Sequence, residues 1–311
     1  MKNCMIYGGG GFIGSHLADE LLNQNFNVTV FDKINFDRRN IAHIENKLNV
    51  IEGDFNNEID IKNSLKNIDI VFHLVSSTLP ASSNQNPVYD VESNLIPSLK
   101  LFSESVKNKI KKIVFVSSGG TVYGIPVEIP VKENHICNPI CSYGVVKKCI
   151  EDFLFMYHKL YGLDYTIFRF SNPFGERQNP FVTQGAIAVF LKKIILNETI
   201  EIWGDGSVIR DYIYIKDAVN VMVKSLSVTS ENKLFNLSLN KGYTLNEILK
   251  YIEHITSIKP KIKYTQPRNI DVPVNILDNT LIKKTFGWKP VTDIEEGISK
   301  TFNYLKNFLK E

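Results

Sequence analysis

Tyr143 and Lys147 are four residues apart, so in a helix their side chains share one face. A lysine ammonium beside a phenol favours the phenolate and lowers the phenol pKa from its usual value of about 10. A phenol tuned in this way acts as a general base near neutral pH. The spacing therefore predicts proton transfer by Tyr143, with Lys147 as its electrostatic partner and as a contact to a ribose. The alternative is a pair of surface side chains without a catalytic role.

A glycine-rich segment near the N-terminus is the second candidate feature. Gly8, Gly11 and Gly14 form G-x-x-G-x-x-G between an expected strand and an expected helix. Glycine at these positions allows a tight turn, close approach of the backbone to a pyrophosphate, and close packing of the helix on the strand. The N–H groups and the dipole at the helix start favour the anion. We predict that Gly8, Gly11, Phe12, Ile13 and Gly14 bind a dinucleotide.

Asp32 follows Gly14 by 18 residues and ends the next expected strand. A carboxylate at this position accepts hydrogen bonds from both ribose hydroxyls of NAD and repels the extra phosphate of NADP. Lys33, Arg38 and Arg39 are close in sequence and would tolerate that phosphate, so NADP remains the alternative to NAD. The other interpretation of Asp32 is a local loop cap.

Five further residues are candidates for the cofactor site because they follow expected strands or lie on an expected helix. They are Asp54, Phe55, Ser76, Thr78 and Asn94. Asp54 suits a contact to the adenine edge, unless it only caps a turn. Asn94 either lines the cofactor or is a packing asparagine.

The elements that must position these residues alternate between strand and helix. Short apolar runs, typical of buried parallel strands, occur at Cys4–Tyr7, Val28–Phe31, Val50–Ile51, Ile70–Val75, Ile113–Val116 and Tyr165–Phe170. Helical periodicity lies between them, as at Phe12–Asn25, Val88–Lys109 and Ser142–Tyr161. The alternation predicts an α/β Rossmann fold, with a doubly wound parallel sheet and helices on both faces.

The pattern changes after Asn172, where Asn-Pro and Gly-Asp-Gly turns interrupt it. The segment Leu234–Leu237 is expected to return to the sheet, and Thr244–Ile255 and Ile294–Leu309 are expected to be helices of a smaller C-terminal α/β cap. We predict an NAD-binding domain of residues 1–171 with a returning segment 208–241, and a substrate-binding cap of residues 172–207 and 242–311.

The composition excludes several classes of protein. The chain is 43% hydrophobic and 22% charged, which is ordinary for a globular protein, and its net charge of +3 does not favour nucleic acid binding. No apolar run approaches the roughly 18 residues of a membrane span. The four cysteines lack C-x-x-C spacing and the six histidines lack H-x-x-x-H spacing, so no metal site is predicted. Unpaired cysteines are typical of the cytoplasm.

Several motifs together resemble the extended short-chain dehydrogenase/reductases. They are Gly8–Gly14, Asp32, the run from Ser117 to Gly124, Tyr143 with Lys147, and Arg210-Asp211-Tyr212. Within that family the chain is similar to the nucleotide-sugar epimerases, such as the UDP-glucose/UDP-N-acetylglucosamine 4-epimerases. The resemblance continues through Gly287-Trp288-Lys289-Pro290 and so covers nearly the whole chain. It implies NAD as the cofactor, a nucleotide sugar as the substrate, and a homodimer formed through paired helices.

The resemblance also implies substrate-binding residues. Asn172 matches a position that binds the diphosphate, and Arg210 and Arg268 match a basic pair on the pyrophosphate, with Tyr212 close by. Arginine suits a diphosphate because its planar guanidinium makes bidentate, charge-assisted bonds. The alternatives are an ion pair of Arg210 with a neighbouring aspartate and a solvated Arg268.

The chain departs from the family pattern at Gly119, where a catalytic serine or threonine is usual. We predict that Thr121, or else Ser118, supplies the missing hydroxyl, or that Tyr143 acts directly on the sugar. Both hydroxyls would otherwise only satisfy loop backbone groups. Asn275 stands where epimerases restricted to plain hexoses carry a bulky tyrosine, which leaves room for an N-acetyl group. Thr78 stands where galactose epimerases often have lysine.

The leading expectation is NAD-dependent 4-epimerisation of a UDP-hexose or UDP-N-acetylhexosamine through a transient 4-keto sugar. The second is NAD(P)H-dependent reduction of a 4-keto nucleotide 6-deoxysugar, such as dTDP-4-dehydro-6-deoxyglucose, because the catalytic pair is the same. The third is an inactive NAD-binding protein, which the loss of the serine would suggest. A place in polysaccharide biosynthesis follows from the resemblance alone.

Overall fold

The computed structural model describes residues 1–182, 184–267 and 272–310. The chain divides into two compact units. The first contains residues 1–124, 137–169 and 219–235, and the second contains residues 125–136, 170–218 and 236–311. Of the residues that the sequence predicted for the NAD-binding domain, 125–136, 170–171, 208–218 and 236–241 thus fall in the second unit. The assignment of NAD to the first part of the chain and of the nucleotide sugar to the second stays a prediction.

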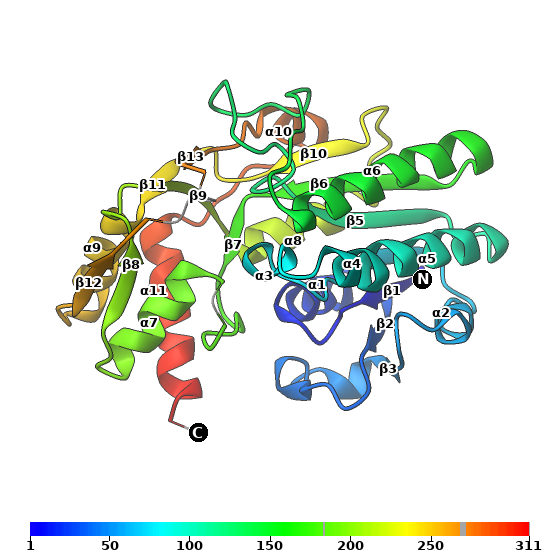
Figure 1. The fold of residues 1–311 in the computed structure, drawn as a ribbon. Coiled ribbons are helices and arrows are strands. Elements are labelled where there is room, and N and C mark those ends of the chain that lie inside the picture. Colours follow the sequence, from blue (N-terminus) through cyan, green and yellow to red (C-terminus); the bar gives the residue numbers. More distant parts are fainter. Residues whose placement is uncertain (183, 268–271, 311) are drawn as a thin grey trace. The chain divides into compact units, whose positions relative to one another are not determined.

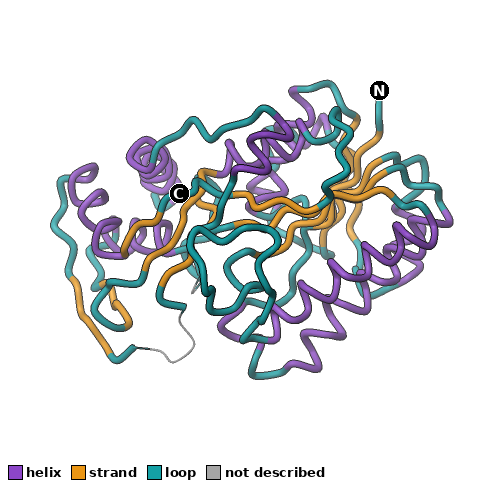
Figure 2. Tube along the Cα trace, turned by 90° about the horizontal axis from the view of Figure 1, so that it is seen from above, coloured by secondary structure: helices purple, strands orange, loops and turns teal. Residues whose placement is uncertain are grey.

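A seven-stranded sheet forms the centre of the first unit, with the strand order β10-β6-β5-β4-β1-β2-β3. Its strands are β1 (Asn3–Tyr7), β2 (Asn27–Asp32), β3 (Asn49–Glu52), β4 (Ile70–His73), β5 (Lys112–Ser118), β6 (Asp164–Phe170) and β10 (Leu234–Leu237). The pairs β1–β2, β2–β3, β1–β4 and β4–β5 are parallel. The strand order reverses at β1, which confirms the doubly wound topology. Figure 2 shows these strands side by side.

The helices of the first unit connect these strands. They are α1 (Phe12–Asn23), α2 (Glu58–Ser64), α3 (Pro80–Ser83), α4 (Pro87–Asp90), the π-helical turn η3 (Val91–Leu95), α5 (Ile96–Lys107) and α6 (Ser142–Tyr161), with 3-10 turns η1 (Arg38–Asn40) and η2 (Glu45–Lys47). Helix α6 has the bounds that the sequence predicted. Helices α5 and α6 lie side by side (Figures 1 and 2).

Apolar side chains from alternate positions of the strands form the core under α5 and α6. Met5 and Tyr7 of β1 join Phe102 of α5 and Leu154 of α6 in one buried cluster. Each such side chain contributes about 1.5–3 kcal/mol of transfer free energy. Because side chains alternate along a strand, Ile6 faces the other side of the sheet, where α1 packs on β1 and β2.

The helix expected over Val88–Lys109 is one continuous helical path that changes its hydrogen bonding in the middle. The turn η3 separates α4 from α5, and Pro97 lies in the first turn of α5. Proline has no N–H, so the carbonyl of Ser93 four residues earlier loses its usual helical donor. The Ser77 hydroxyl donates to that carbonyl at 3.5 Å. The proline therefore creates an attachment point for the loop after β4.

The second unit is built around β9 (Ile209–Tyr214), which pairs with β11 (Gly242–Thr244), β13 (Val274–Asn275) and β7 (Asn172–Phe174). A separate pair joins β8 (Ile200–Trp203) to β12 (Ile262–Thr265). Its helices are α7 (Ala186–Ile195), α9 (Leu245–Thr256), α10 (Thr280–Phe286) and α11 (Ile294–Phe308), and α8 (Ile215–Lys224) begins in this unit. The sequence predicted α9 and α11 but not these strands, of which β7, β11 and β13 are only three, three and two residues long.

A capping box fixes the start of α9. The Thr244 hydroxyl accepts from the Glu247 N–H at 3.1 Å, and the Thr244 N–H donates to the Glu247 carboxylate at 2.7 Å. The predicted first residue of this helix is therefore its N-cap. Among the described residues, no helix has the length and apolar character needed to cross a bilayer.

Candidate active site

The glycine loop between β1 and α1 has the shape that the motif predicts. Gly8 has a φ of +83°, which favours glycine. A Cβ on Gly14 would lie 2.3 Å from the carbonyl oxygen of Gly8, so a side chain there would force the loop away from the helix. Gly11 is the N-cap of α1 and makes no side-chain cap. The first N–H groups of α1 are thus available to an anion.

Asp32 ends β2 directly beneath this loop. One oxygen of its carboxylate accepts from the Gly10 N–H at 2.9 Å, and the other accepts from the Lys33 N–H at 2.9 Å. Burial raises the pKa of Asp32, and these hydrogen bonds oppose the shift. Each carboxylate oxygen has a second lone pair, so holding the loop does not prevent Asp32 from accepting a ribose hydroxyl. The contact to ribose stays a prediction.

Asp54 and Phe55, expected at the adenine edge, have local structural partners. Asp54 accepts from the Asn56 backbone at 2.9 Å and from its side chain at 3.0 Å, which caps a turn. The Phe55 ring packs on Tyr7 and His73 with centroid separations of 5.4 and 5.3 Å. The structure therefore shows the turn cap that the sequence left as an alternative, and an adenine contact stays a prediction.

Tyr143 and Lys147 lie one turn apart at the start of α6. The Lys147 ammonium lies 5.6 Å from the centre of the Tyr143 ring and donates to the carbonyl of Val116, at the end of β5, at 3.1 Å. Lys147 is only 5% exposed. The two side chains therefore lie together in the same unit as the glycine loop, with Lys147 buried and Tyr143 partly exposed.

The electrostatics of this pair differ from the sequence-based expectation. Burial raises the pKa of Tyr143 to about 12, and a hydrogen bond from Ser76 opposes the shift. Burial lowers the pKa of Lys147 to about 8, while Asp90 and Glu151 oppose that shift. The expected decrease in the pKa of Tyr143 is wrong for this structure, because removal of the phenol from water raises that pKa.

The loop after β4 is attached to a buried carboxylate that sequence reasoning missed. Asp90 accepts from the Thr78 hydroxyl at 2.5 Å, from the Asn94 amide at 3.0 Å and from the Ser142 hydroxyl at 2.7 Å. The side-chain amide oxygen of Asn94 in turn accepts from the Ser77 N–H at 2.8 Å. Thr78 and Asn94 therefore hold the loop, and their predicted contact to the cofactor stays a prediction. The i, i+4 spacing of Asp90 and Asn94 could have indicated from the sequence that their side chains share one helix face.

A second buried network behind α6 was also missed. Glu151 and Arg169 form an ion pair at 2.6 Å in which both side chains are 3% exposed, and the Ser117 hydroxyl donates to Glu151 at 2.5 Å. Arg169 also lies over the Tyr123 ring at 4.6 Å. Glu151 is one turn beyond Lys147, so this network fixes the part of α6 that carries the amine.

Of the hydroxyls proposed to replace the missing serine, Ser118 ends β5 and Thr121 lies in the turn after it. The Thr121 hydroxyl points to the carbonyl of Ser118 at 3.5 Å, and that carbonyl also accepts from the Thr121 N–H at 3.2 Å. Thr121 thus has the local backbone contact that the sequence left as an alternative. The catalytic roles of Thr121 and Ser118 stay predictions.

The predicted substrate residues in the second unit lie on neighbouring strands. Asn172 of β7 is opposite Tyr212 of β9, and the Asn172 amide donates to the Asp211 carbonyl at 2.9 Å. The Arg210 guanidinium donates to the Val272 carbonyl at 2.7 Å. Burial raises the pKa of Tyr212 to about 12. Arg268 lies outside the described residues.

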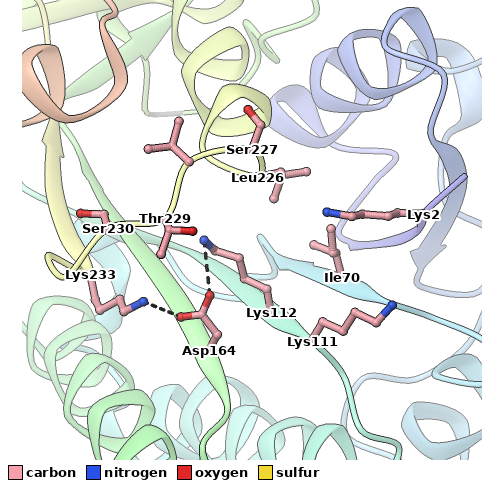
Figure 3. A pocket seen from close by; sticks show the side chains of 11 residues that line it. Lys2, Ile70, Lys111, Lys112, Asp164, Leu226, Ser227, Thr229, Ser230 and Lys233 are labelled. Carbon is pink, nitrogen blue, oxygen red and sulfur yellow. Dashed lines mark hydrogen bonds and ion pairs between the residues drawn. The ribbon is translucent and has the colours of Figure 1, made fainter.

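A cavity of about 210 Å³ lies at the edge of the seven-stranded sheet where its strands begin, opposite the edge that carries the glycine loop and Lys147 (Figure 3). Its polar lining includes Lys2, Lys112, Asp164 and Lys233. Asp164 pairs with Lys233 at 2.6 Å and with Lys112 at 3.6 Å. The motif residues are at the carboxyl edge, so this cavity is not part of the predicted site. Among the described residues, no group of three or more histidine, cysteine or acidic side chains would hold a metal.

Comparisons with known proteins identify the family. The sequence profile of the NAD dependent epimerase/dehydratase family matches residues 4–238. A relative from Methanocaldococcus jannaschii, named a putative UDP-glucose 4-epimerase, is 36% identical over 306 residues, which cover 97% of this chain and 98% of the relative. A relative from Escherichia coli, named a dTDP-4-dehydro-6-deoxyglucose reductase, is 30% identical over 314 residues, with 97% of each chain covered.

A solved structure supports the same assignment. The UDP-N-acetylglucosamine 4-epimerase of Methanobrevibacter ruminantium, in complex with UDP-N-acetylmuramic acid, matches with a TM-score of 0.93 and 32% identity over 99% of both chains. The Rossmann fold and the family expected from the sequence are thus confirmed. This chain belongs to the NAD dependent epimerase/dehydratase family, and its cofactor is NAD.

Proposed function

We propose that this protein interconverts the C4 epimers of a UDP-hexose or UDP-N-acetylhexosamine, with NAD as its cofactor. The observation that carries the proposal is the pair of the partly exposed Tyr143 and the buried Lys147 at the start of α6, in the unit that contains the dinucleotide loop. Relatives named as 4-epimerases support this reaction.

The chain's own part in the reaction is binding and proton transfer. Gly8, Gly11 and Gly14 and the start of α1 would hold the NAD pyrophosphate, and Asp32 would hold a ribose. NAD, when bound, supplies a hydride acceptor and donor. As the phenolate, Tyr143 accepts the proton of the C4 hydroxyl, and as the neutral phenol it later returns that proton to the oxygen of the 4-keto sugar. Lys147 holds the position of the phenol and contributes a nearby positive charge.

We extend the proposal to the second unit, whose residues would hold the UDP diphosphate. Arg210 supplies a guanidinium, and Asn172 and Tyr212 lie opposite each other on adjacent strands. Arg268 is proposed as the second basic contact. Asn275, at the position of a bulky tyrosine in hexose-restricted epimerases, favours acceptance of an N-acetyl sugar. This preference is tested by comparing kcat/KM for UDP-glucose with kcat/KM for UDP-N-acetylglucosamine.

The decisive experiment is to incubate the purified protein with UDP-glucose or with UDP-N-acetylglucosamine, without added cofactor. Formation of the C4 epimer, followed by chromatography, is the expected result because the hydride is returned in each cycle. The alternative reaction, reduction of dTDP-4-dehydro-6-deoxyglucose, would instead consume added NADH or NADPH; it is favoured by the Escherichia coli relative. Bound NAD with no turnover of any of these sugars would contradict both reactions.

We also propose a homodimer formed through α5 and α6. Exposed apolar side chains on the two helices include Ile96, Val145 and Leu160, which are 42%, 46% and 63% exposed. Apolar surface of this kind on neighbouring helices suits a second copy of the chain. Sedimentation should show a dimer, and Leu160→Asp should shift it to monomer while far-UV circular dichroism stays unchanged.

We place the reaction in the cytoplasm, in the supply of activated sugars for polysaccharide biosynthesis. The four cysteines are free thiols, which suits a reducing compartment. Deletion of the gene should lower the product sugar in the cell's surface polysaccharide. An unchanged sugar composition would contradict this placement without affecting the proposed reaction.

A further inference from the structure

The cavity at the edge where the strands begin is a part of the molecule that the sugar chemistry does not use. Every described residue that lines it belongs to the first unit. Its walls come from the starts of neighbouring strands and from the segment 226–230, which follows α8. Ile70 opens β4 and pairs with Lys112, which opens β5. Because parallel strands begin at one edge of the sheet, the fold itself brings these residues together.

The lining of this cavity carries more positive than negative charge. Lys2, Lys112 and Lys233 contribute ammonium groups, and among the described lining residues Asp164 supplies the only carboxylate. Asp164 pairs with Lys233 at 2.6 Å and with Lys112 at 3.6 Å. Figure 3 shows the Lys2 ammonium directed into the space on the side of Lys112. One carboxylate does not neutralise three ammonium groups, so the cavity attracts an anion.

The Lys112 ammonium is mostly buried and makes only long contacts. Its side chain is 15% exposed. It lies 3.6 Å from the Asp164 carboxylate and 3.5 Å from the Ser225 carbonyl, whereas N–H···O hydrogen bonds usually measure about 2.7–3.2 Å. Burial lowers the pKa of Lys112, Asp164 opposes that shift, and repulsion from Lys233 adds to it. A desolvated ammonium with three donors and weak partners is stabilised by a ligand that accepts from it.

The size of the cavity and its donors indicate the kind of anion. Pockets for drug-sized ligands measure about 300–1,000 Å³, so a cavity of about 210 Å³ suits an anion smaller than a nucleotide sugar. Lysine binds phosphate as a point charge. Thr229 lines the cavity with an exposed side chain, and Figure 3 shows its hydroxyl directed towards Lys112. Ammonium and hydroxyl donors around one small space match the oxygens of a phosphate group.

We propose that this cavity is a binding site for a small phosphate-bearing anion, held by Lys112, Lys2 and Lys233 with Thr229 as a hydroxyl donor. The anion is inorganic phosphate or the phosphate group of a small metabolite, since both present the same oxygens to the lysines. Asp164 sets the affinity, because its carboxylate repels the anion and competes with it for Lys112 and Lys233. The site goes beyond the proposed function and does not depend on it.

Titration calorimetry of the NAD-loaded protein with inorganic phosphate and with glucose 6-phosphate tests the site, with sodium chloride at matched ionic strength as the reference. Bound NAD blocks the start of α1, which would otherwise attract phosphate as well. Lys112→Met should weaken binding about 10- to 100-fold, the loss of one hydrogen bond between charged groups. Tighter binding of glucose 6-phosphate than of phosphate would identify a metabolite as the source, and the reverse order would identify free phosphate. Binding of neither anion would overturn the proposal.

Lys2→Gln keeps the test decisive if Lys112→Met fails to fold, because Lys2 is exposed ahead of β1. It should weaken binding about 3- to 10-fold, less than Lys112→Met, since water screens an exposed charge. Unchanged affinity in Lys2→Gln together with unchanged affinity in Lys112→Met would contradict the site.

Asp164→Asn should have the opposite effect and tighten binding about 3- to 10-fold, because it removes a negative charge from the cavity. Lys111→Gln is the matched control. Lys111 precedes Lys112, but its ammonium pairs with Asp69 at 2.7 Å and is directed away from Lys112 in Figure 3. Its removal should leave the affinity nearly unchanged. Equal losses in Lys111→Gln and Lys112→Met would show a general attraction of the surface for anions and would overturn the proposal.

The position of the anion can be measured directly. Arsenate has the charge and shape of phosphate, and the anomalous scattering of its arsenic locates it in crystals of the NAD-loaded protein. A peak beside Lys112 is expected in the wild type and should be absent from Lys112→Met. If the protein turns over no UDP-sugar but the peak is present, the proposed function fails and the site stands. If a UDP-sugar is turned over and no peak lies beside Lys112, the anion site fails alone.

Discussion

The two edges of the seven-stranded sheet both carry lysines beside carboxylates, but their surroundings differ. At the carboxyl edge, Lys147 is 5% exposed and the ion pair of Glu151 and Arg169 is 3% exposed on each side. At the amino edge, the side chains of Lys112, Lys233 and Asp164 are 15%, 22% and 36% exposed. Water therefore screens the charges of Lys112, Lys233 and Asp164 at the amino edge and hardly reaches those at the carboxyl edge. Burial, more than the choice of residues, decides which edge can do chemistry.

Tyr143→Phe tests the chemical side of this comparison and should have the largest effect. Removing the hydroxyl takes away the proton acceptor and should lower kcat at least about 1,000-fold, the equivalent of about 4 kcal/mol. Turnover of the UDP-sugar and the amount of NAD bound by the purified protein are the measurements. NAD content should stay at the wild-type level. Epimerisation at an undiminished rate would remove Tyr143 from the mechanism.

Glu151→Ala tests the buried ion pair and should destabilise the fold by about 3–5 kcal/mol, because it leaves the Arg169 guanidinium buried without its carboxylate. Chemical denaturation followed by circular dichroism measures the loss. The control is Glu151→Leu combined with Arg169→Met, which removes both charges and should recover most of the stability. If the double variant is no more stable than Glu151→Ala, the loss of stability comes from packing and not from the unpaired buried charge of Arg169.

Lys147 should make stability depend on pH. Its pKa is about 8 in the folded protein and 10.5 ordinarily, so between these values the unfolded chain binds more protons. The free energy of unfolding should therefore rise with pH across this window, by about 3 kcal/mol, and the cost of burying the charge is fully present below about pH 8. Lys147→Met should accordingly be more stable than wild type at about pH 7 and lose that advantage towards about pH 10. A difference that stays constant with pH would show that Lys147 is not desolvated.

Asp164→Asn at the amino edge should have the smallest effect. Its ion pairs with Lys112 and Lys233 are partly exposed, and such pairs contribute about 1 kcal/mol or less. The free energy of unfolding should fall by no more than that, and kcat should be unchanged. A change in turnover would mean that the two edges are coupled, and the contrast between them would not hold.

Much of the first unit was predictable because its signals are local. The apolar runs of β1, β2, β4, β5 and β6 are continuous, and the period of α6 is sustained over five turns. The glycine spacing predicted the turn at Gly8 and the close contact at Gly14. In the second unit, β7 and β13 are only three and two residues long, so their pairing depends on partners distant in the sequence.

The site was predictable to the extent that it depends on spacing within one element. Tyr143 and Lys147 share a helical face wherever that helix lies, and Asp32 ends a strand beside the glycine loop. The contact of Asp90 with Ser142 joins residues 52 positions apart, and the contacts of Glu151 with Ser117 and Arg169 span 34 and 18 positions. Periodicity carries no information about such pairs.

By itself, the sequence determined the Rossmann topology, the dinucleotide loop, the tyrosine–lysine pair and the family, because each follows from residue types at fixed local spacings. Only the tertiary structure decided the direction of the pKa shifts at Tyr143 and Lys147 and the burial of Asp90 and Glu151 beside them. Both depend on how much water reaches a group and on which distant segment packs against it. Removal from water raised the pKa of Tyr143 where its neighbour in sequence predicted a decrease.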